Sequence, residues 1–456
     1  MSSTRTLIDR HRWFPWATGS VGLLIFAAGV WALVNDVERW NAVWYVPAWY
    51  GYLLVLDAVI FRRQGHSFLS HRRRELATML FWSVPFWFLF EAYNLVLKNW
   101  YYVFVLRSDW TQAIVTCLAF ATVLPACFVH SELLRSLGCW SELRCRPFRV
   151  RGPLTYFFAG FGALCIVLPL VWPRYAFWMV WGATLGVPEV MNYRSGAPSL
   201  LRDLESGRPG RVLRLLLGGM WAGVAWESLN YWARCKWIYT VPGMEDWKLF
   251  EMPVMGFLGF PALSLEAFAL YALICHYLRG GRHWEEKDSQ PAQAIARVGY
   301  VCAASAAIAF SAATFVAVTK VNVESRRPLL AELEGMDSGA VARLRAVGIR
   351  TPEQLHRVVE TDGIAAFCRR TRLAAEQVER AYMHAALALH KGMGPRNAKL
   401  LLAAGVTRVV DLVLANPQEL YHRLLTVADQ YGFPPPRLAE VKVWIRAARV
   451  AGSIRR

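Results

Sequence analysis

Nine apolar runs constrain the fold of this chain more than any other feature. They lie near residues 16–34, 44–61, 76–97, 111–134, 154–172, 175–193, 212–232, 253–278 and 294–319. A helix of about 20 apolar residues crosses the roughly 30 Å of hydrocarbon in a bilayer. With 55% hydrophobic and 14% aromatic residues, the composition also excludes an ordinary soluble protein. We therefore predict an all-α fold, a polytopic helical membrane bundle of about nine spans.

Positive charge is concentrated in loops that alternate along the chain. The basic stretches are 62–74, 131–152, 194–211 and 279–293, and Arg5, Arg10 and Arg12 precede the first run. Because cytoplasmic loops carry an excess of Lys and Arg, the pattern predicts a cell-membrane protein with its N-terminus in the cytoplasm. An odd number of spans then places the tail after residue 320 outside. The basic loops are also expected to contact anionic lipids.

A polar sequence occurs twice and indicates a duplication. EAYNLVLKNWYY begins at Glu91, and ESLNYWARCKWIY begins at Glu227, 136 positions later. Upstream, Asp57 and Glu189 lie 132 positions apart. We predict two four-helix membrane repeats, 1–134 and 153–280, joined by the basic loop 135–152 and followed by a loop and ninth span in 281–320. An even number of helices per copy preserves orientation, so a pseudo-two-fold axis along the membrane normal should relate the copies.

Each copy of the polar sequence carries an acid, an amide and a base at the spacing of one helical face. The two sets are Glu91, Asn94 and Lys98, and Glu227, Asn230 and Arg234. A carboxylate in hydrocarbon costs roughly 2.5 to 3.5 kcal/mol on insertion scales, so it should face the bundle interior. The pair therefore forms either an ion or small-substrate site or a hydrogen-bonded clamp between spans. The secondary candidate acids are Asp57, Glu189, Glu251 and Glu266.

The sequence carries no specific catalytic or metal-binding motif. HExxH, GxSxG and GxxxxGK[ST] are absent, and the nine cysteines occur singly with no CxxC pair. These absences disfavour metalloproteases, α/β-hydrolases and P-loop NTPases. We predict no catalytic residue, no metal and no cofactor, and favour a non-enzymatic or transporter-like protein.

The tail after residue 320 has ordinary amphipathic helices and its own repeat. Gly335 and Gly392, Gly348 and Gly405, and Leu355 and Leu412 are each 57 positions apart. A GxG turn, a helix and then VGI or AGV before a new helix start make up each copy. Over about 329–450 this pattern resembles the uncharacterised tandem helix-hairpin-helix family, which implies a small soluble all-α domain at 325–456.

The resemblance implies that a GxG turn presents backbone N–H groups to a phosphate. In the second copy Gly392, Met393 and Gly394 match the turn, and Lys391, Arg396 and Lys399 are placed to contact a nucleic-acid backbone. In the first copy Asp337 replaces the second glycine and would repel phosphate, which predicts a structural role. Such domains serve protein contact, including self-association, or DNA binding. A membrane-anchored DNA-binding protein and a structural membrane scaffold are therefore the alternatives to a transporter-like role.

Overall fold

The computed structural model describes residues 2–35, 37, 40, 43–244, 247–281, 284–285 and 297–454. The side chains of residues 2–12 and 452–454 lie outside this description. They include those of Arg5, Arg10 and Arg12, which precede the first apolar run. The later part of the basic loop 279–293 and the predicted start of the ninth span at residue 294 also lie outside the described residues. The chain divides into unit 1, residues 1–99, 110–233 and 246–321, and unit 2, residues 100–109, 234–245 and 322–456.

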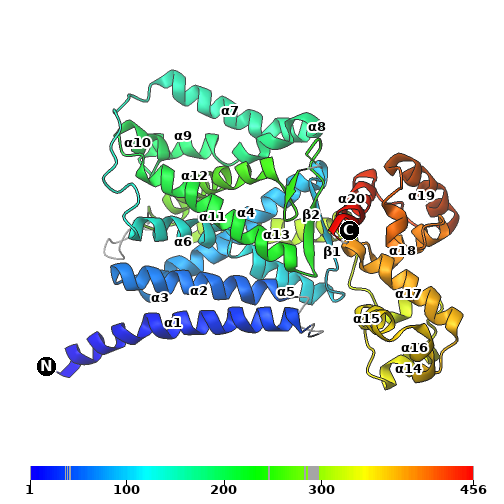
Figure 1. Ribbon diagram of the computed structural model, residues 1–456. Coiled ribbons are helices and arrows are strands. Elements are labelled where there is room, and N and C mark those ends of the chain that lie inside the picture. The colour runs from blue at the N-terminus through cyan, green and yellow to red at the C-terminus, as the bar shows by residue number, and fades with distance from the viewer. Residues whose placement is uncertain are drawn as a thin grey trace. The chain divides into compact units, whose positions relative to one another are not determined.

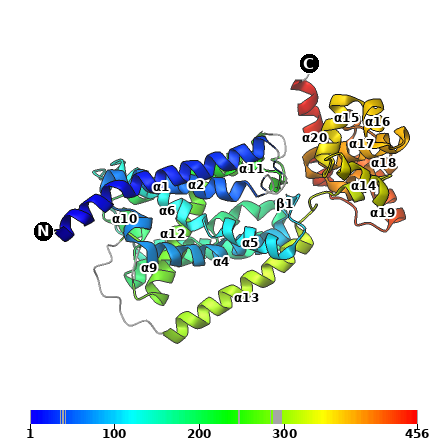
Figure 2. The ribbon, with the colours of Figure 1, turned by 90° about the horizontal axis from the view of Figure 1, so that it is seen from below.

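Unit 1 is a bundle of long helices that run roughly along a common direction, with α1 packed along α2 (Figures 1 and 2). Its long helices are α1 (Ser2–Val34), α2 (Tyr45–Gln64), α4 (Arg73–Leu97), α5 (Asp109–Phe120), α6 (Val123–Ser136), α7 (Gly152–Val171), α9 (Gly186–Ser195), α11 (Gly210–Trp232), α12 (Gly259–Leu278) and α13 (Arg297–Val321). Shorter elements are α3 (Phe68–His71), α8 (Pro173–Ala176), η1 (Phe177–Gly182), α10 (Leu200–Glu205), β3 (Lys248–Leu249), β4 (Met252–Pro253) and η2 (Val254–Leu258). Helices dominate the described residues, so the all-α class is confirmed.

Six helical segments of unit 1 are long and apolar enough to cross a membrane. They are Trp13–Val34, Arg73–Leu97, Asp109–Ser136, Gly152–Val171, Val254–Leu278 and Arg297–Val321. The apolar stretches of α1, α7 and α13 are mostly exposed, with Leu24 of α1 at 69%. Water would penalise such surface, whereas lipid chains accept it. These helices are therefore compatible with a membrane location.

The apolar run at 175–193 does not form the single helix that its composition predicts. It is divided into η1 and α9, and Trp181 has a non-helical ψ of 25°. The second piece begins at Gly186, where an added Cβ would lie 2.5 Å from the carbonyl oxygen of Phe158 in α7. A Cβ added at Gly162 of α7 would likewise overlap the backbone at Gly186. At the break, the chain therefore comes so close to the backbone of α7 that only glycine fits at Gly186.

Aromatic contacts in unit 1 join the two copies of the predicted repeat reciprocally. The ring of Trp49 on α2 stacks on Trp226 of α11, with centroids 5.5 Å apart. The ring of Phe90 on α4 stacks on Trp181 of η1, also at 5.5 Å. Trp49 and Trp181 are 132 positions apart, and Phe90 and Trp226 are 136 apart. The predicted second span of each predicted copy thus contacts the predicted third span of the other, the reciprocity expected of a two-fold relation.

Unit 2 begins with a ribbon made from segments that correspond in the two predicted copies. Strands β1 (Trp100–Val103) and β2 (Lys236–Tyr239) pair antiparallel, with Tyr101 opposite Ile238. These two residues are 137 positions apart, the spacing of the repeat in this part of the chain. The ribbon is therefore two-fold symmetric about the Tyr101–Ile238 pair. Residues 322–327 extend it by running parallel to β1, with the Tyr102 N–H donating to the Asn322 carbonyl at 2.8 Å.

The rest of unit 2 contains two small helical cores. The elements are η3 (Leu330–Glu332), α14 (Ser338–Ala346), α15 (Pro352–Asp362), α16 (Ile364–Thr371), α17 (Ala375–Leu389), η4 (His390–Gly392), α18 (Gly394–Ala403), η5 (Val409–Leu412), α19 (Pro417–Tyr431) and α20 (Leu438–Ile454). One core is built from residues 330–385 and the other from residues 387–448. Gly348 and Gly405 end equivalent helices with φ of 86° and 83°. Asp337 caps α14, its Oδ1 accepting the Ala340 N–H at 2.7 Å.

Candidate functional site

The predicted polar pair lies at the ends of α4 and α11, and the two bases do not continue the helical faces. Helix α4 ends one residue before Lys98, which is left-handed with φ 52°. The side-chain oxygen of Asn94 accepts the Asn99 N–H at 2.8 Å and so caps this helix end. Helix α11 ends two residues before Arg234, after which the backbone is extended. The expectation that Lys98 and Arg234 share a helical face with the acids is therefore wrong, whereas Asn94 has a clear capping role.

Glu91 and Glu227 are enclosed in an aromatic layer of unit 1. Their exposed fractions are 0% and 1%. The indole Nε1–H of Trp87 donates to Glu91 Oε1 at 3.2 Å. The ring of Trp87 contacts Trp226, the neighbour of Glu227, with centroids 5.8 Å apart. Trp87 thus contacts both Glu91 and the Trp226 ring, which belongs to the same helix as Glu227.

Two further polar contacts occupy positions that correspond in the predicted repeat, although their residue types differ. In the first copy the Tyr52 hydroxyl lies 2.8 Å from His130 Nε2. In the second copy the Thr184 N–H donates to Glu266 Oε1 at 2.9 Å. Tyr52 and Thr184 are 132 positions apart, and His130 and Glu266 are 136 apart. The sequence did not reveal the equivalence because no identical residue marks it. The remaining secondary acid, Glu251, is 2% exposed and precedes β4, outside α12.

Asp57 and Glu189 hold the starts of two short helices. The Ser67 hydroxyl donates to Asp57 Oδ2 at 2.7 Å, and a backbone N–H of α3 donates to Oδ1 at 3.0 Å. The Ser199 hydroxyl donates to Glu189 Oε1 at 2.5 Å, and a backbone N–H of α10 donates to the same oxygen at 2.8 Å. Ser67 and Ser199 are the N-caps of these helices and are 132 positions apart. Both acids therefore stabilise helix N-termini.

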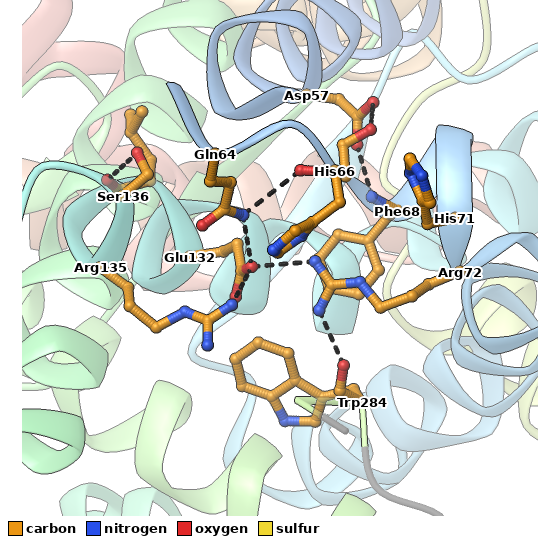
Figure 3. Close-up of polar contacts among 12 residues, drawn as sticks. Asp57, Gln64, His66, Phe68, His71, Arg72, Glu132, Arg135, Ser136 and Trp284 are labelled. Atoms are coloured by element: carbon orange, nitrogen blue, oxygen red, sulfur yellow. Dashed lines mark hydrogen bonds and ion pairs between the residues drawn. The ribbon is translucent and has the colours of Figure 1, made fainter. Parts of the chain in front are cut away.

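A buried ion-pair network lies at the basic end of unit 1 (Figure 3). Glu132 of α6 has 0% exposure, and its Oε1 accepts from Gln64 at 2.8 Å, Arg72 at 2.9 Å and Arg135 at 2.5 Å. Arg72 also donates to the Trp284 carbonyl at 2.8 Å. The network ties three distant segments together. The sequence did not single it out, because arginines at span ends are expected from topology alone.

Three further ion pairs, made by two arginines, lie at helix ends in the same region. Arg279 lies 2.7 Å from Glu75, which joins the end of α12 to the start of α4. Arg211 at the start of α11 lies 2.9 Å from Asp203 and 2.6 Å from Glu285. Removing one member of such a pair would leave an uncompensated charge. Across the described ranges, no three His, Cys, Asp or Glu residues group closely enough to hold a metal ion.

The GxG turn of the second tail copy is covered by other residues of unit 2. The Ser325 hydroxyl donates to the Gly392 carbonyl at 2.5 Å. A Cβ at Gly392 would lie 2.5 Å from the Val103 side chain of β1, and one at Gly394 would lie 2.6 Å from Ser325. Three residues of the turn are left-handed: Lys391 (φ 50°), Gly392 (67°) and Gly394 (80°). Met393 lies between the two glycines and is buried. The backbone therefore faces protein where the resemblance implies a phosphate.

The bases beside this turn also contact protein groups. Arg396 lies 2.7 Å from Glu324, and Asn397 donates to the same carboxylate at 2.6 Å. Lys399 lies over the ring of Tyr431, with its Nζ 5.0 Å from the centroid. These contacts give Arg396 and Lys399 structural partners inside unit 2. The arrangement favours protein contact over phosphate contact at this turn.

Glu324 follows α13 and belongs to a buried charged cluster in unit 2. Burial and the neighbouring Glu440 carboxylate raise the pKa of Glu324 to about 7, against the opposing effects of Arg396, Asn397 and Arg437. Arg437 forms an ion pair with Glu440 and lies over the Tyr101 ring of β1, 5.3 Å from its centroid. The cluster therefore connects the β1–β2 ribbon, the segment after α13 and the second helical core.

Comparison with known families recognises only the C-terminal region. Residues 334–451 are similar to a domain of unknown function, DUF4332. No curated protein and no solved structure matches the chain. The match covers about a quarter of the 456 residues and carries no activity with it. It agrees in extent with the two helical cores of unit 2.

Proposed function

We propose that the chain is a multi-pass integral membrane protein with nine spans, formed by four-helix copies at 1–134 and 153–280 and a ninth span in 281–320. The six apolar helical segments support this reading. Helix α2 with 20 residues, α11 with 23 and the broken η1–α9 pair account for the other three spans. The reciprocal aromatic stacks of the two copies support the duplication.

In this proposal the N-terminus is cytoplasmic and residues 325–456 are extracytoplasmic. Unit 2 combines this tail with residues 100–109 and 234–245, the two polar loops predicted to face outward. The ion pairs of Arg72, Arg211 and Arg279 gather at the opposite ends of the helices, as the positive-inside rule predicts for the cytoplasmic side.

Two cysteines offer a matched test of this orientation. Cys368 in the tail is partly exposed, and Cys145 in the basic loop is exposed. Single-cysteine variants in intact cells should react with an impermeant thiol reagent at Cys368 and not at Cys145. Cys145 should react only after the membrane is permeabilised. The reverse pattern would refute the orientation.

The proposed activity is binding and movement of a proton, an ion or a small substrate at Glu91 and Glu227. The observation that carries it is the burial of both carboxylates within helices of unit 1, with Trp87 of the first predicted copy contacting Glu91 and the Trp226 ring of the second. Ionisable groups inside a membrane are costly, so they are retained chiefly where they pair or act. The alternative is a clamp in which the same groups only hold α4 and α11 together.

Neutralising both acids distinguishes transport from a clamp. The E91Q/E227Q variant, reconstituted in liposomes, should lose proton or cation flux while its unfolding temperature stays close to that of the wild type. The matched control is D57N/E189Q, which also neutralises two buried acids. Because these acids hold helix N-termini, the control should lose stability and keep flux per folded molecule. Unchanged flux in E91Q/E227Q together with lower stability would establish the clamp.

For the C-terminal region we propose an interaction domain of the tandem helix-hairpin-helix type. Its second GxG turn contacts Val103 and Ser325 of the same chain, which supports protein contact or self-association. The alternative is a membrane-anchored DNA-binding protein. At low salt, any retardation of duplex DNA by the full-length protein in detergent should be the same in K391Q/K399Q. Retardation that this double variant abolishes would establish the DNA-binding alternative.

A further inference from the structure

A cavity of about 350 Å³ lies at the basic end of unit 1, where the start of α11 meets the loop after α6. Five arginines line it: Arg135, Arg144, Arg208, Arg211 and Arg214. The lining acids are Asp203 and Glu285, so five positive charges face two negative ones. The wall therefore carries an excess of three positive charges. A concentration of guanidinium groups around an open cavity favours an anion.

Only part of this charge is neutralised by the protein. Arg211 is held by both lining acids, at 2.9 and 2.6 Å, and Arg135 is held by Glu132 outside the cavity. Arg214 donates to the Cys139 carbonyl at 3.3 Å. In the part of the chain that the structure describes, no carboxylate forms an ion pair with Arg144, Arg208 or Arg214. The exposed guanidinium groups of Arg144 and Arg208 are thus available to a ligand, with Arg214 beside them.

The N-terminus of α11 adds to the positive potential. This 23-residue helix begins at Gly210 with no side-chain cap, and Gly210, Arg211 and Arg214 of its first turns line the cavity. A Cβ at Gly210 would lie 2.5 Å from the carbonyl oxygen of Trp140, so the loop after α6 closes directly on the helix start. Backbone N–H groups at a helix start and arginine side chains together make a strong site for anions.

We propose that this cavity binds a phosphate group at the cytoplasmic face of the membrane, either as free phosphate or as the headgroup of an anionic lipid. Arginine forks match phosphate oxygens bidentately, and a phosphate carries enough negative charge to offset the excess. A cavity of about 350 Å³ has room for one phosphate with its immediate substituents. The site goes beyond the proposed function and does not depend on flux through Glu91 and Glu227.

Binding to full-length protein in an uncharged maltoside detergent tests the site. One titration uses inorganic phosphate, and a second compares dioctanoyl phosphatidylglycerol with dioctanoyl phosphatidylcholine. The test variant is R144Q/R208Q, which changes two exposed cavity arginines. The matched control is R73Q/R74Q, which removes the same charge from exposed positions on the same basic side. Saturable binding of phosphate identifies the free ion, whereas preference for phosphatidylglycerol without phosphate binding identifies the lipid headgroup.

The test variant should weaken binding by about tenfold or more, and the control by less than about twofold. An equal loss in both variants would show diffuse attraction to a basic surface and overturn the site. Binding of neither probe by the wild-type protein would also overturn it. The E91Q/E227Q variant should bind the probe as the wild type does, so a failure of the transport proposal leaves this result unaffected.

Discussion

Replacing Gly392 by alanine should loosen the contact between the second tail turn and β1. Gly392 has φ 67°, a conformation that is unfavourable for alanine. A Cβ there would also lie 2.5 Å from Val103 Cγ2 and 2.6 Å from its Cβ. Valine is stiff at χ1, so its side chain cannot simply rotate away. The substitution therefore combines backbone strain with steric overlap.

The two effects can be separated by a control in the same domain. Backbone strain alone costs about 1–2 kcal/mol, and overlap in a packed contact adds about 1–3 kcal/mol. Gly405 has φ 83° and no atom within 4 Å of an added Cβ, so Gly405→Ala should show the strain alone. The difference between the two variants corresponds to roughly 5- to 150-fold in the opening equilibrium of the contact.

Hydrogen exchange on the full-length protein measures that opening. The Tyr102 N–H bonds to Asn322 at 2.8 Å, and the Glu324 N–H bonds to Tyr102 at 2.9 Å. Peptides covering these amides should exchange faster in Gly392→Ala than in Gly405→Ala. Adding Val103→Ala to Gly392→Ala should recover part of the protection. Equal exchange in the two glycine variants would refute the steric argument.

Three further predictions concern charged and capping groups. The pKa of Glu324 is raised from 4.5 to about 7. Between these two pH values folded unit 2 binds a proton that the unfolded chain has already released. Its stability should therefore fall by up to about 3 kcal/mol as the pH rises from 5 to 8. Thermal unfolding monitored in unit 2 checks this, and a slope that persists in E324Q would contradict it. Arg72→Met should destabilise unit 1 by about 3–5 kcal/mol because it leaves Glu132 buried with less compensation, and R72M/E132L should recover stability in a thermal-shift assay. Ser67→Ala and Ser199→Ala should each cost about 1–2 kcal/mol in the same assay; markedly unequal losses would contradict the equivalence of the two capping sites.

The sequence predicted the general architecture from local patterns. The helical class follows from the length and composition of the apolar runs, and the structure confirms it. The 57-residue spacing of Gly348 and Gly405 matches two equivalent left-handed helix ends in the tail. The equivalence of Asp57 and Glu189 is matched by equivalent serine caps. Each of these features depends on residues close together in the chain.

Other features of the site were not accessible from spacing alone. The prediction that Lys98 shares a helical face with Glu91 was wrong because the Asn94 side chain caps the helix first. The network at Glu132 combines residues that are 60 or more positions apart, such as Arg72. The partners of the Gly392 turn come from β1 and from Ser325, far away in the sequence. No local pattern carries this information.

By itself, the sequence determined that the chain forms membrane-length helices, that its polar segments recur at offsets of 132 to 137, and that a small helical tail follows. Helix length and periodicity depend on near neighbours, so they can be read directly. Only the tertiary structure decided that Trp87 contacts both Glu91 and the Trp226 ring, that arginines from separate segments line one cavity, and that Val103 covers the Gly392 turn. These outcomes depend on close packing between distant segments, where a shift of one side chain changes the contact.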